Sequence, residues 1–452
     1  MMTQEELFKI LVAHCKEYGF IFPSSEIYDG LGAVYDYGQM GVELKNNIKR
    51  YWWEAMTRLH ENIVGIDSAI FMHPKIWEAS GHVGAFNDPL IDNKDSKKRY
   101  RADVLIEDYI GKLEDKVRKD VEKGKKKFGD AFDEAKFIET NPNCVRNNAK
   151  IAEVKKRMAD ALNANDLEAL RQIIIDCDIV CPISGTKNWT EVRQFIFRMR
   201  EFEQMEMQFF IKPGTELEWF AKWKENRLAW HKALGMGDDN YRFHDHDKLA
   251  HYANAATDIE FRFPFGFKEL EGIHSRTNFD LGNHQKFSGK KIEYFDPELG
   301  QSYTPFVVET SIGVDRMVLA VLSNSFKEEQ LDNGESRVVL SIPAPLAPVK
   351  VAVMPLLKNN QELVDLAQKI MDDLKYDYNC QYDEKDSIGK RYRRQDAIGT
   401  PFCVTVDHDS LEDGCVTIRH RDSMAQERVR IEDLNSIIGK EVSLNNLLRK
   451  LK

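Results

Sequence analysis

The chain has 452 residues, of which 42% are hydrophobic, so it is long enough to bury a sizeable core and to form two or three domains. Its net charge of -10 argues against a protein that coats nucleic acid through many nonspecific phosphate contacts, although it leaves room for a local basic surface. No basic segment followed by an apolar one opens the chain and no apolar run is long enough to span a bilayer, so we expect a globular protein of the cytoplasm that does not bind membranes.

The first ninety residues predict two helices and a strand. Residues 4–18 have the pattern of a short amphipathic helix, and residues 20–28 that of an extended stretch. A longer helix is predicted over residues 41–56, because apolar side chains recur there at helical spacing. The alternation over residues 63–71 predicts a strand directly after it.

The composition becomes more charged between residues 91 and 179. Helices are predicted over residues 148–163 and 166–176, and a lysine cluster occupies residues 123–127. Such runs are usually solvated helix faces, and contact with RNA is the alternative.

The segment from Phe195 to Phe210 alternates bulky apolar residues with charged ones. This is a strand pattern, and one face of the strand carries arginines and carboxylates that a merely solvated strand rarely needs. We therefore predict that it forms the floor of a site for a charged substrate.

The rest of the chain predicts a second strand-rich region and a small α/β domain. A helix over residues 216–233 precedes strands between 257 and 309, and Arg316 then follows a glycine at the start of an apolar helix, where anions are favoured. A proline-rich linker covers residues 343–348. Beyond it we predict strands at 349–356, 402–406, 415–418 and 428–431, and a helix over 361–374.

Several of these segments resemble the signature motifs of class II aminoacyl-tRNA synthetases, and of dimeric glycyl-tRNA synthetases in particular. Residues 35–47, YDYGQMGVELKNN, are similar to the start of motif 1; residues 200–206, REFEQME, to the second half of motif 2; and residues 303–316 to motif 3. The resemblance implies an α+β fold, with an antiparallel catalytic sheet, a helical insertion and a C-terminal α/β anticodon-binding domain. It divides the chain at residues 1–90, 91–180, 181–342 and 343–452.

The resemblance has a gap between Phe195 and Ile196. In the family, a segment similar to residues 190–195, TEVRQF, is followed by several dozen residues that include a Phe-Arg-x-Glu strand, the first half of motif 2. Three interpretations follow: an ordinary enzyme whose sequence record lacks a segment, a catalytically impaired tRNA-binding pseudo-synthetase with a true deletion, and an unrelated ligase.

The resemblance implies a glycine–tRNA ligase that uses ATP with Mg²⁺, acts on glycine and tRNA(Gly), and forms a homodimer through motif 1. Such chemistry needs cations for phosphates and carboxylates for the metal and the ammonium group. The implied ATP contacts are Phe197, Arg198, Met199, Arg200, Glu201, Phe202, Glu269 (through Mg²⁺), Leu270, Gly313, Val314, Asp315 and Arg316. The implied glycine contacts are Arg101, Phe202, Glu203, Gln204, Met205, Glu206, Glu309, Thr310, Ser311, Ile312 and Gly313.

A basic patch in the last domain, with Lys390, Arg391, Arg393 and Arg394 around a tyrosine, suits RNA bases and phosphates, and a solvated helix face is the alternative.

Two groups of residues suggest a metal site only weakly. The stretch from His244 to His251 is rich in His and Asp but lacks a helical i, i+4 histidine pair with a third ligand, so we expect turn and helix capping there. Cys177 and Cys181 form a close pair without a second pair, which favours ordinary buried thiols.

Overall fold

The computed structural model describes residues 4–28, 30, 34–69, 71–81, 88–96, 98–129, 132–163, 166–190, 193–195, 201–246, 249–250, 252–331, 334 and 336–451. The chain forms two compact units, one from residues 1–72 with 199–452 and the other from residues 73–198. Helices and an antiparallel sheet are combined in the first unit, which confirms the predicted α+β class.

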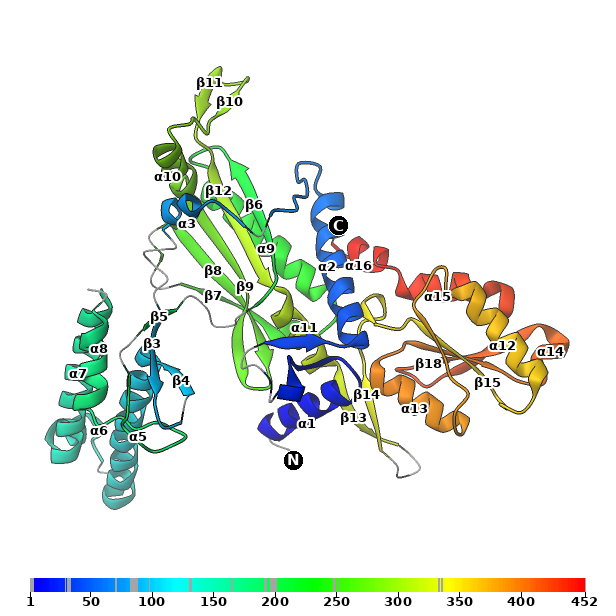
Figure 1. Ribbon diagram of the computed structural model, residues 1–452, viewed down its shortest axis with the longest axis horizontal. Coiled ribbons are helices and arrows are strands. Elements are labelled where there is room, and N and C mark those ends of the chain that lie inside the picture. Colours follow the sequence, from blue (N-terminus) through cyan, green and yellow to red (C-terminus); the bar gives the residue numbers. More distant parts are fainter. Residues whose placement is uncertain are drawn as a thin grey trace. The chain divides into compact units, whose positions relative to one another are not determined.

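A five-stranded antiparallel sheet is the centre of the first unit (Figure 1). Its strands, in spatial order, are β6 (Gln204–Ile211), β12 (Phe306–Gly313), β9 (Gly266–Thr277), β8 (Ala255–Phe263) and β7 (Tyr241–Asp245). In β6 every second side chain is buried, as a strand with one covered face requires. Strand β6 lies at the edge and, within the described residues, pairs with β12 alone.

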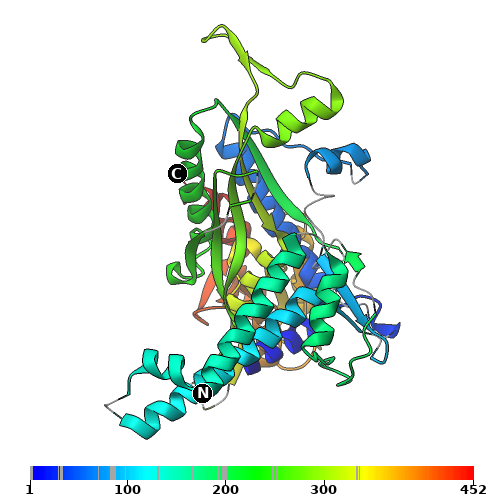
Figure 2. The same cartoon turned by 90° about the vertical axis from the view of Figure 1, so that its left-hand side faces the viewer.

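Helices cover one face of this sheet. Helix α9 (Glu216–Lys232) packs on β9 and β12, and α11 (Val314–Ser325) packs on β8 and on α2 (Gln39–Leu59). Figure 2 shows α9, in green, lying along the sheet. The rings of Phe209 on β6 and Trp219 and Trp223 on α9 lie 4.8 and 5.4 Å apart between centroids, so aromatic packing seals this side. The other face is open for chemistry.

The N-terminal elements confirm both predicted helices but not the strand. Helix α1 (Gln4–Glu17) and α2 form as predicted, with the short pair β1 (Ile21–Pro23) and β2 (Tyr35–Tyr37) and a 3-10 turn (Glu26–Tyr28) between them. The strand predicted over residues 63–71 is wrong for the described part of that segment, which has no ladder partner. Three of its apolar side chains are instead exposed, namely Val64 (81%), Ile66 (77%) and Phe71 (95%).

Smaller elements complete the sheet region. They are η3 (Asp238–Asn240), α10 (Phe279–Ser288), the hairpin of β10 (Tyr294–Asp296) and β11 (Gln301–Tyr303), and the hairpin of β13 (Phe326–Gln330) and β14 (Ser336–Leu340).

The C-terminal part is an α/β domain around a second five-stranded sheet, in the order β16-β15-β17-β18-β19. Strand β15 (Val351–Pro355) runs parallel to β16 (Cys380–Tyr382) and β17 (Phe402–Val406), whereas β18 (Cys415–His420) and β19 (Gln426–Arg430) are antiparallel. Its other elements are η4 (Ala344–Leu346), α12 (Gln361–Leu374), α13 (Ile388–Ile398), α14 (Ser410–Asp413), η5 (Ile431–Asp433), α15 (Leu434–Val442) and α16 (Asn445–Arg449). Helix α12 and strand β17 have the predicted bounds.

The unit of residues 73–198 is mainly helical. Helices α5 (Ala102–Phe128), α7 (Pro142–Asn163) and α8 (Leu167–Asp176) share a core, and α6 (Glu134–Thr140) packs on α5 and α7. In the same unit, β3 (Asp88–Asn93) pairs with β4 (Lys98–Arg101) and β5 (Arg193–Phe195), and α3 (Pro74–Ala79) is the remaining helix of its described residues. No helix within the described ranges combines the length and the apolar character needed to cross a membrane.

Candidate active site

The open face of the main sheet brings together polar side chains from β6 and β12. The strand register places Gln204, Glu206 and Gln208 opposite Gly313, Ser311 and Glu309, respectively. Within each strand these residues are two positions apart, so the side chains of the five that are not glycine project on the side away from the α9 core. Sequence analysis predicted five of the six as substrate contacts, and the sheet collects them on one surface.

Two carboxylates dominate this surface. The Ser311 hydroxyl donates to Glu206 Oε1 at 3.3 Å, and the Gln208 amide donates to Glu309 Oε2 at 2.6 Å. Desolvation at the sheet surface, and then the charge of Glu309, raise the pKa of Glu206. Two carboxylates whose charges repel each other attract a small cation, and the ammonium group of an amino acid is one.

Strand β9 adds residues that sequence analysis did not single out for a role. His274 lies directly opposite Glu309, with Nδ1 3.7 Å from Oε1, and burial lowers the pKa of its imidazole. Arg276 Nη1 also reaches Glu309 at 3.3 Å while Nε holds Asp280 at 2.7 Å. Residues 269–277 show no clear period-2 alternation that would have identified this side of the site, since Leu270 and Ile273 are three positions apart.

Arg316 and Glu269, the predicted contacts for the ATP phosphates and magnesium, bind each other. Arg316 Nη1 donates to the Glu269 carbonyl at 2.9 Å and lies 3.1 Å from Glu269 Oε2. Both side chains are about half exposed, so a nucleotide has access to them. Arg316 occupies the first turn of α11, where the helix N-terminus also favours an anion. Carboxylate oxygens are ligands that Mg²⁺ prefers, so Glu269 fits the metal bound to ATP.

Several predicted contacts are instead core residues. Successive side chains point to opposite faces of a strand and in different directions around a helix, so a continuous motif cannot present all of its side chains to one ligand. The side chains that lie in the core are those of Met205, Leu270, Thr310, Ile312 and Val314.

Glu203 and Asp315, predicted to contact glycine and ATP respectively, both bind residues of the N-terminal part. Glu203 accepts from Lys49 Nζ at 2.8 Å and lies 3.3 Å from Lys45 Nζ. Desolvation opposes ionisation of Glu203, but these two ammonium groups outweigh it and lower its pKa. Asp315 accepts from the Tyr37 hydroxyl and lies 3.7 Å from Lys45 Nζ. These two acids therefore join motifs 2 and 3 to α2, and their contacts with glycine and ATP stay predictions.

Other predicted residues are placed outside this surface. Phe197, Arg198, Met199 and Arg200 lie outside the described residues, and Glu201 and Phe202 are exposed just before β6. Arg101 belongs to the other unit, where it pairs with Asp103 across 3.0 Å. Because the two units are described separately, its contact with glycine stays a prediction.

The basic patch of the last domain lies on α13. Arg391 is 2% exposed and donates to the backbone carbonyls of Glu384, Lys385, Asp386 and Pro355. It is therefore a structural residue, which corrects its predicted role in tRNA binding. Arg394 is bound to Asp383 and Asp386 but remains partly exposed, and Lys390 is exposed. These two and Arg393 remain the predicted tRNA contacts.

The His- and Asp-rich stretch pairs with neighbouring strands and helices. His246 Nε2 lies 2.9 Å from Asp258 Oδ2, and Asp245 Oδ1 accepts from Lys224 at 2.9 Å. Asp247 and His251 lie outside the described residues. In the part of the chain that the structure describes, no three His, Cys, Asp or Glu side chains come together as a metal site.

Comparison with known proteins agrees with this geometry. Residues 88–197 match the glycyl-tRNA synthetase insertion domain 1, and residues 350–441 match an anticodon binding domain. The glycine–tRNA ligase of Chlorobaculum tepidum is 46% identical over 486 residues, covering 93% of this chain and 97% of that protein. The corresponding ligase of Staphylococcus haemolyticus is 42% identical over 499 residues, covering 96% and 98%, and that of Treponema denticola is 45% identical over 444 residues, covering 96% of each. The chain therefore belongs to the glycine–tRNA ligase family.

Proposed function

We propose that this protein activates glycine with ATP and transfers it to tRNA(Gly). In the first step a glycine carboxylate oxygen attacks the α-phosphorus of ATP and pyrophosphate leaves. In the second, the terminal ribose hydroxyl of the tRNA attacks the carbonyl carbon of glycyl-adenylate and AMP leaves. The observation that carries the proposal is the carboxylate-rich sheet face of a chain that belongs to this family.

Glycine would bind through its ammonium group to Glu206, Glu309 and Ser311, whose oxygen atoms lie on adjacent strands. Arg316 would contact the ATP phosphates, and Glu269 would hold the magnesium ion that shields their charge. The Arg316–Glu269 pair keeps both groups beside each other at the start of α11. Positioning and charge stabilisation are the main contributions that such a site makes.

Transfer requires tRNA, and Lys390, Arg393 and Arg394 on α13 are the proposed contacts to its anticodon end.

A homodimer through α2 and the following segment is also proposed. The exposure of Val64, Ile66 and Phe71 supports it, because a partner would cover this apolar row. We place the enzyme in the cytoplasm, where its tRNA substrate is used. We also propose that the chain divides into domains after residues 90, 180 and 342.

We also propose that the working enzyme contains a motif 2 strand between Phe195 and Ile196. Two observations support this: β6 pairs on one side only within the described residues, and both arginines of the described site surface, Arg276 and Arg316, are paired with carboxylates. An intact mass several kilodaltons above 52.4 kDa for the protein from its own cells would support the strand, and a mass of 52.4 kDa would contradict it.

The activity itself is tested by glycine-dependent exchange of pyrophosphate into ATP and by charging of tRNA(Gly). Glu206→Gln should raise the KM for glycine by about ten- to a hundredfold, because a charge-assisted contact contributes about 1.5–3 kcal/mol. Glu412→Gln is the matched control, since Glu412 is an exposed carboxylate on α14, and it should leave KM unchanged. Retained tRNA binding without exchange in the unaltered protein would contradict the proposal and favour a pseudo-synthetase.

A further inference from the structure

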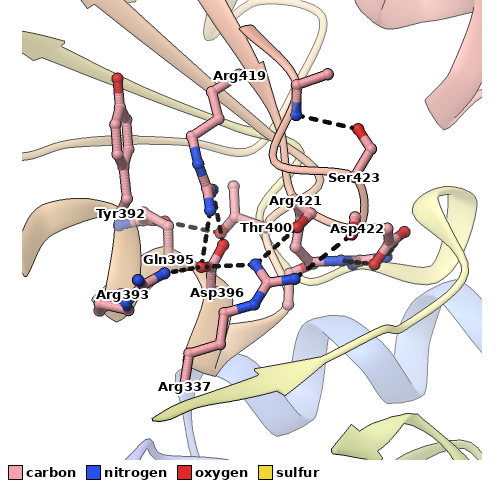
Figure 3. Close-up of polar contacts among 12 residues, drawn as sticks. Arg337, Tyr392, Arg393, Gln395, Asp396, Thr400, Arg419, Arg421, Asp422 and Ser423 are labelled. Carbon is pink, nitrogen blue, oxygen red and sulfur yellow. Dashed lines mark hydrogen bonds and ion pairs between the residues drawn. The ribbon is translucent and has the colours of Figure 1, made fainter. Parts of the chain in front are cut away.

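A buried carboxylate joins the C-terminal domain to the rest of its unit. Asp396, at the end of α13, is fully buried and is surrounded by three guanidinium groups (Figure 3). Arg419 of β18 binds both of its oxygens, at 2.8 and 3.0 Å, and Arg393 approaches Oδ2 at 3.5 Å. The third group, Arg337, comes from β14 and reaches Oδ2 at 3.0 Å. Asp396 is thus shared between the two parts of the unit.

Arg337 makes further contacts on both sides of this junction. Its Nε donates to Glu329 Oε2 at 2.7 Å, across the β13–β14 hairpin. On the other side, Nη1 donates to the Arg421 carbonyl at 2.9 Å, and Nη2 to the Asp422 carbonyl at 3.4 Å. Its side chain is almost fully buried, so Arg337 cannot itself touch RNA. A planar guanidinium with several fixed donors defines an orientation as well as a distance.

The hairpin that carries Arg337 is continuous with the proposed ATP site. Helix α11, which begins next to Arg316, ends at Ser325, and β13 starts at the next residue. The Ser341 amide, just after β14, donates to the Ser325 carbonyl at 2.8 Å and closes the hairpin onto the end of α11. Arg337 therefore connects the helix of the proposed tRNA contacts, α13, to the helix of the proposed ATP contact.

We propose that Arg337 is a positioning residue for the tRNA-dependent step. By holding Asp396, it fixes the C-terminal domain against the catalytic sheet, so that a tRNA bound by α13 presents its acceptor end at the site. Activation of glycine needs no tRNA and is independent of this contact. The inference rests on the proposed function, and it adds a role to a residue that contacts neither substrate.

The test compares the two half-reactions in Arg337→Met, which keeps the length of the apolar stem but removes the charge and the donors. We expect pyrophosphate exchange within about twofold of the unaltered protein, a tRNA Kd within about threefold, and a kcat for charging at least about tenfold lower. Glu329→Gln is the matched control. It removes the charge of the hairpin partner of Arg337 but keeps the contacts across the junction, and it should charge tRNA normally.

An equal loss of both half-reactions, or no loss in either, would overturn the proposal. The linker is also held by Asn47, which donates to the carbonyls of Leu346 and Ala347 at 3.2 Å, so we expect Arg337→Met to fold. If it does not, Arg337→Lys keeps a charge and must show a smaller split in the same direction. Hydrogen exchange of the amides in residues 336–348 adds a readout that needs no activity. Hydrogen exchange should be faster in Arg337→Met. Unchanged hydrogen exchange would show that Arg337 does not hold the C-terminal domain in place, and this result would stand even if the proposed activity were absent.

Discussion

The buried ion cluster beneath the sheet makes a quantitative prediction about stability. Glu271 of β9 is fully buried on the covered face, where Arg227 Nε of α9 lies 2.5 Å from Oε1 and His231 Nε2 lies 2.7 Å from Oε2. Burial alone would raise the pKa of Glu271, but these partners outweigh it and lower the pKa from 4.5 to about 2. A shift of this size corresponds to about 3 kcal/mol of stability at neutral pH.

Arg227→Met should therefore destabilise the protein by about 3–5 kcal/mol, since it leaves a buried carboxylate without its main partner. This loss of unfolding free energy, called the deficit below, should also depend on pH, because His231 can take up a proton. Burial lowers the pKa of His231 in the unaltered protein, so its neutral ring costs stability as the pH falls below the unfolded value of about 6.5. In the variant, Glu271 instead favours the imidazolium and raises the folded pKa of His231. That stabilisation is complete below about pH 6.5 and is lost as the pH rises through the folded pKa.

Both effects make the deficit smaller at about pH 6 than at about pH 9. Urea unfolding of the two proteins at each pH, with equal m-values required, measures the deficit. Lys222→Met on the same helix is the control. It breaks the exposed Lys222–Glu218 pair and should cost at most about 0.5 kcal/mol at either pH. A deficit below about 1 kcal/mol for Arg227→Met, or one that grows toward low pH, would refute the reasoning.

Three further substitutions test local packing and helix capping. Gly41→Ala places a Cβ 1.8 Å from the Phe20 carbonyl oxygen, which is backbone and cannot move aside, so a loss of about 1–3 kcal/mol is expected in urea unfolding. Gly111→Ala, inside α5 with open space around the added carbon, should instead stabilise by up to about 1 kcal/mol, and equal effects of the two would contradict the explanation. Asn360→Ala removes the side chain that caps α12 by accepting from the Glu362 and Leu363 amides, and a shift in thermal unfolding equivalent to about 1 kcal/mol should follow.

The sequence predicted elements well wherever local pattern decides them. Helix α12 has an N-cap, a regular apolar stripe and a clear end, and its bounds agree with the prediction. The segment at 63–71 has an equally good strand pattern, but a strand forms only with a partner, and the described chain does not supply one. Periodicity predicts which face of an element is apolar, and it does not predict what covers that face.

The candidate site was predictable in position but less so in its individual side chains. The alternation of side chains along a strand would by itself have assigned Thr310 and Ile312 to the core rather than to the site. The partners of Glu203 and Arg391 were not predictable from local sequence. The lysines that bind Glu203 are more than 150 positions away, and the carbonyls around Arg391 come from the loop at 384–386 and from the end of strand β15. A charged residue in a motif faces the ligand only if no closer opposite charge or backbone dipole binds it first.

The charges on the open sheet face show why the segment around residue 196 matters for catalysis. Glu206 and Glu309 provide negative charge for an ammonium group, while Arg276 and Arg316 are already neutralised by Asp280 and Glu269. ATP brings several negative charges, and breaking these pairs to bind it would offset much of the gain. A further cation beside β6 would bind the α-phosphate without that cost, and the open edge of β6 in the described structure is where a strand carrying it would pair. On this proposal the described surface would bind the amino acid, and the strand added at β6 would complete the nucleotide site.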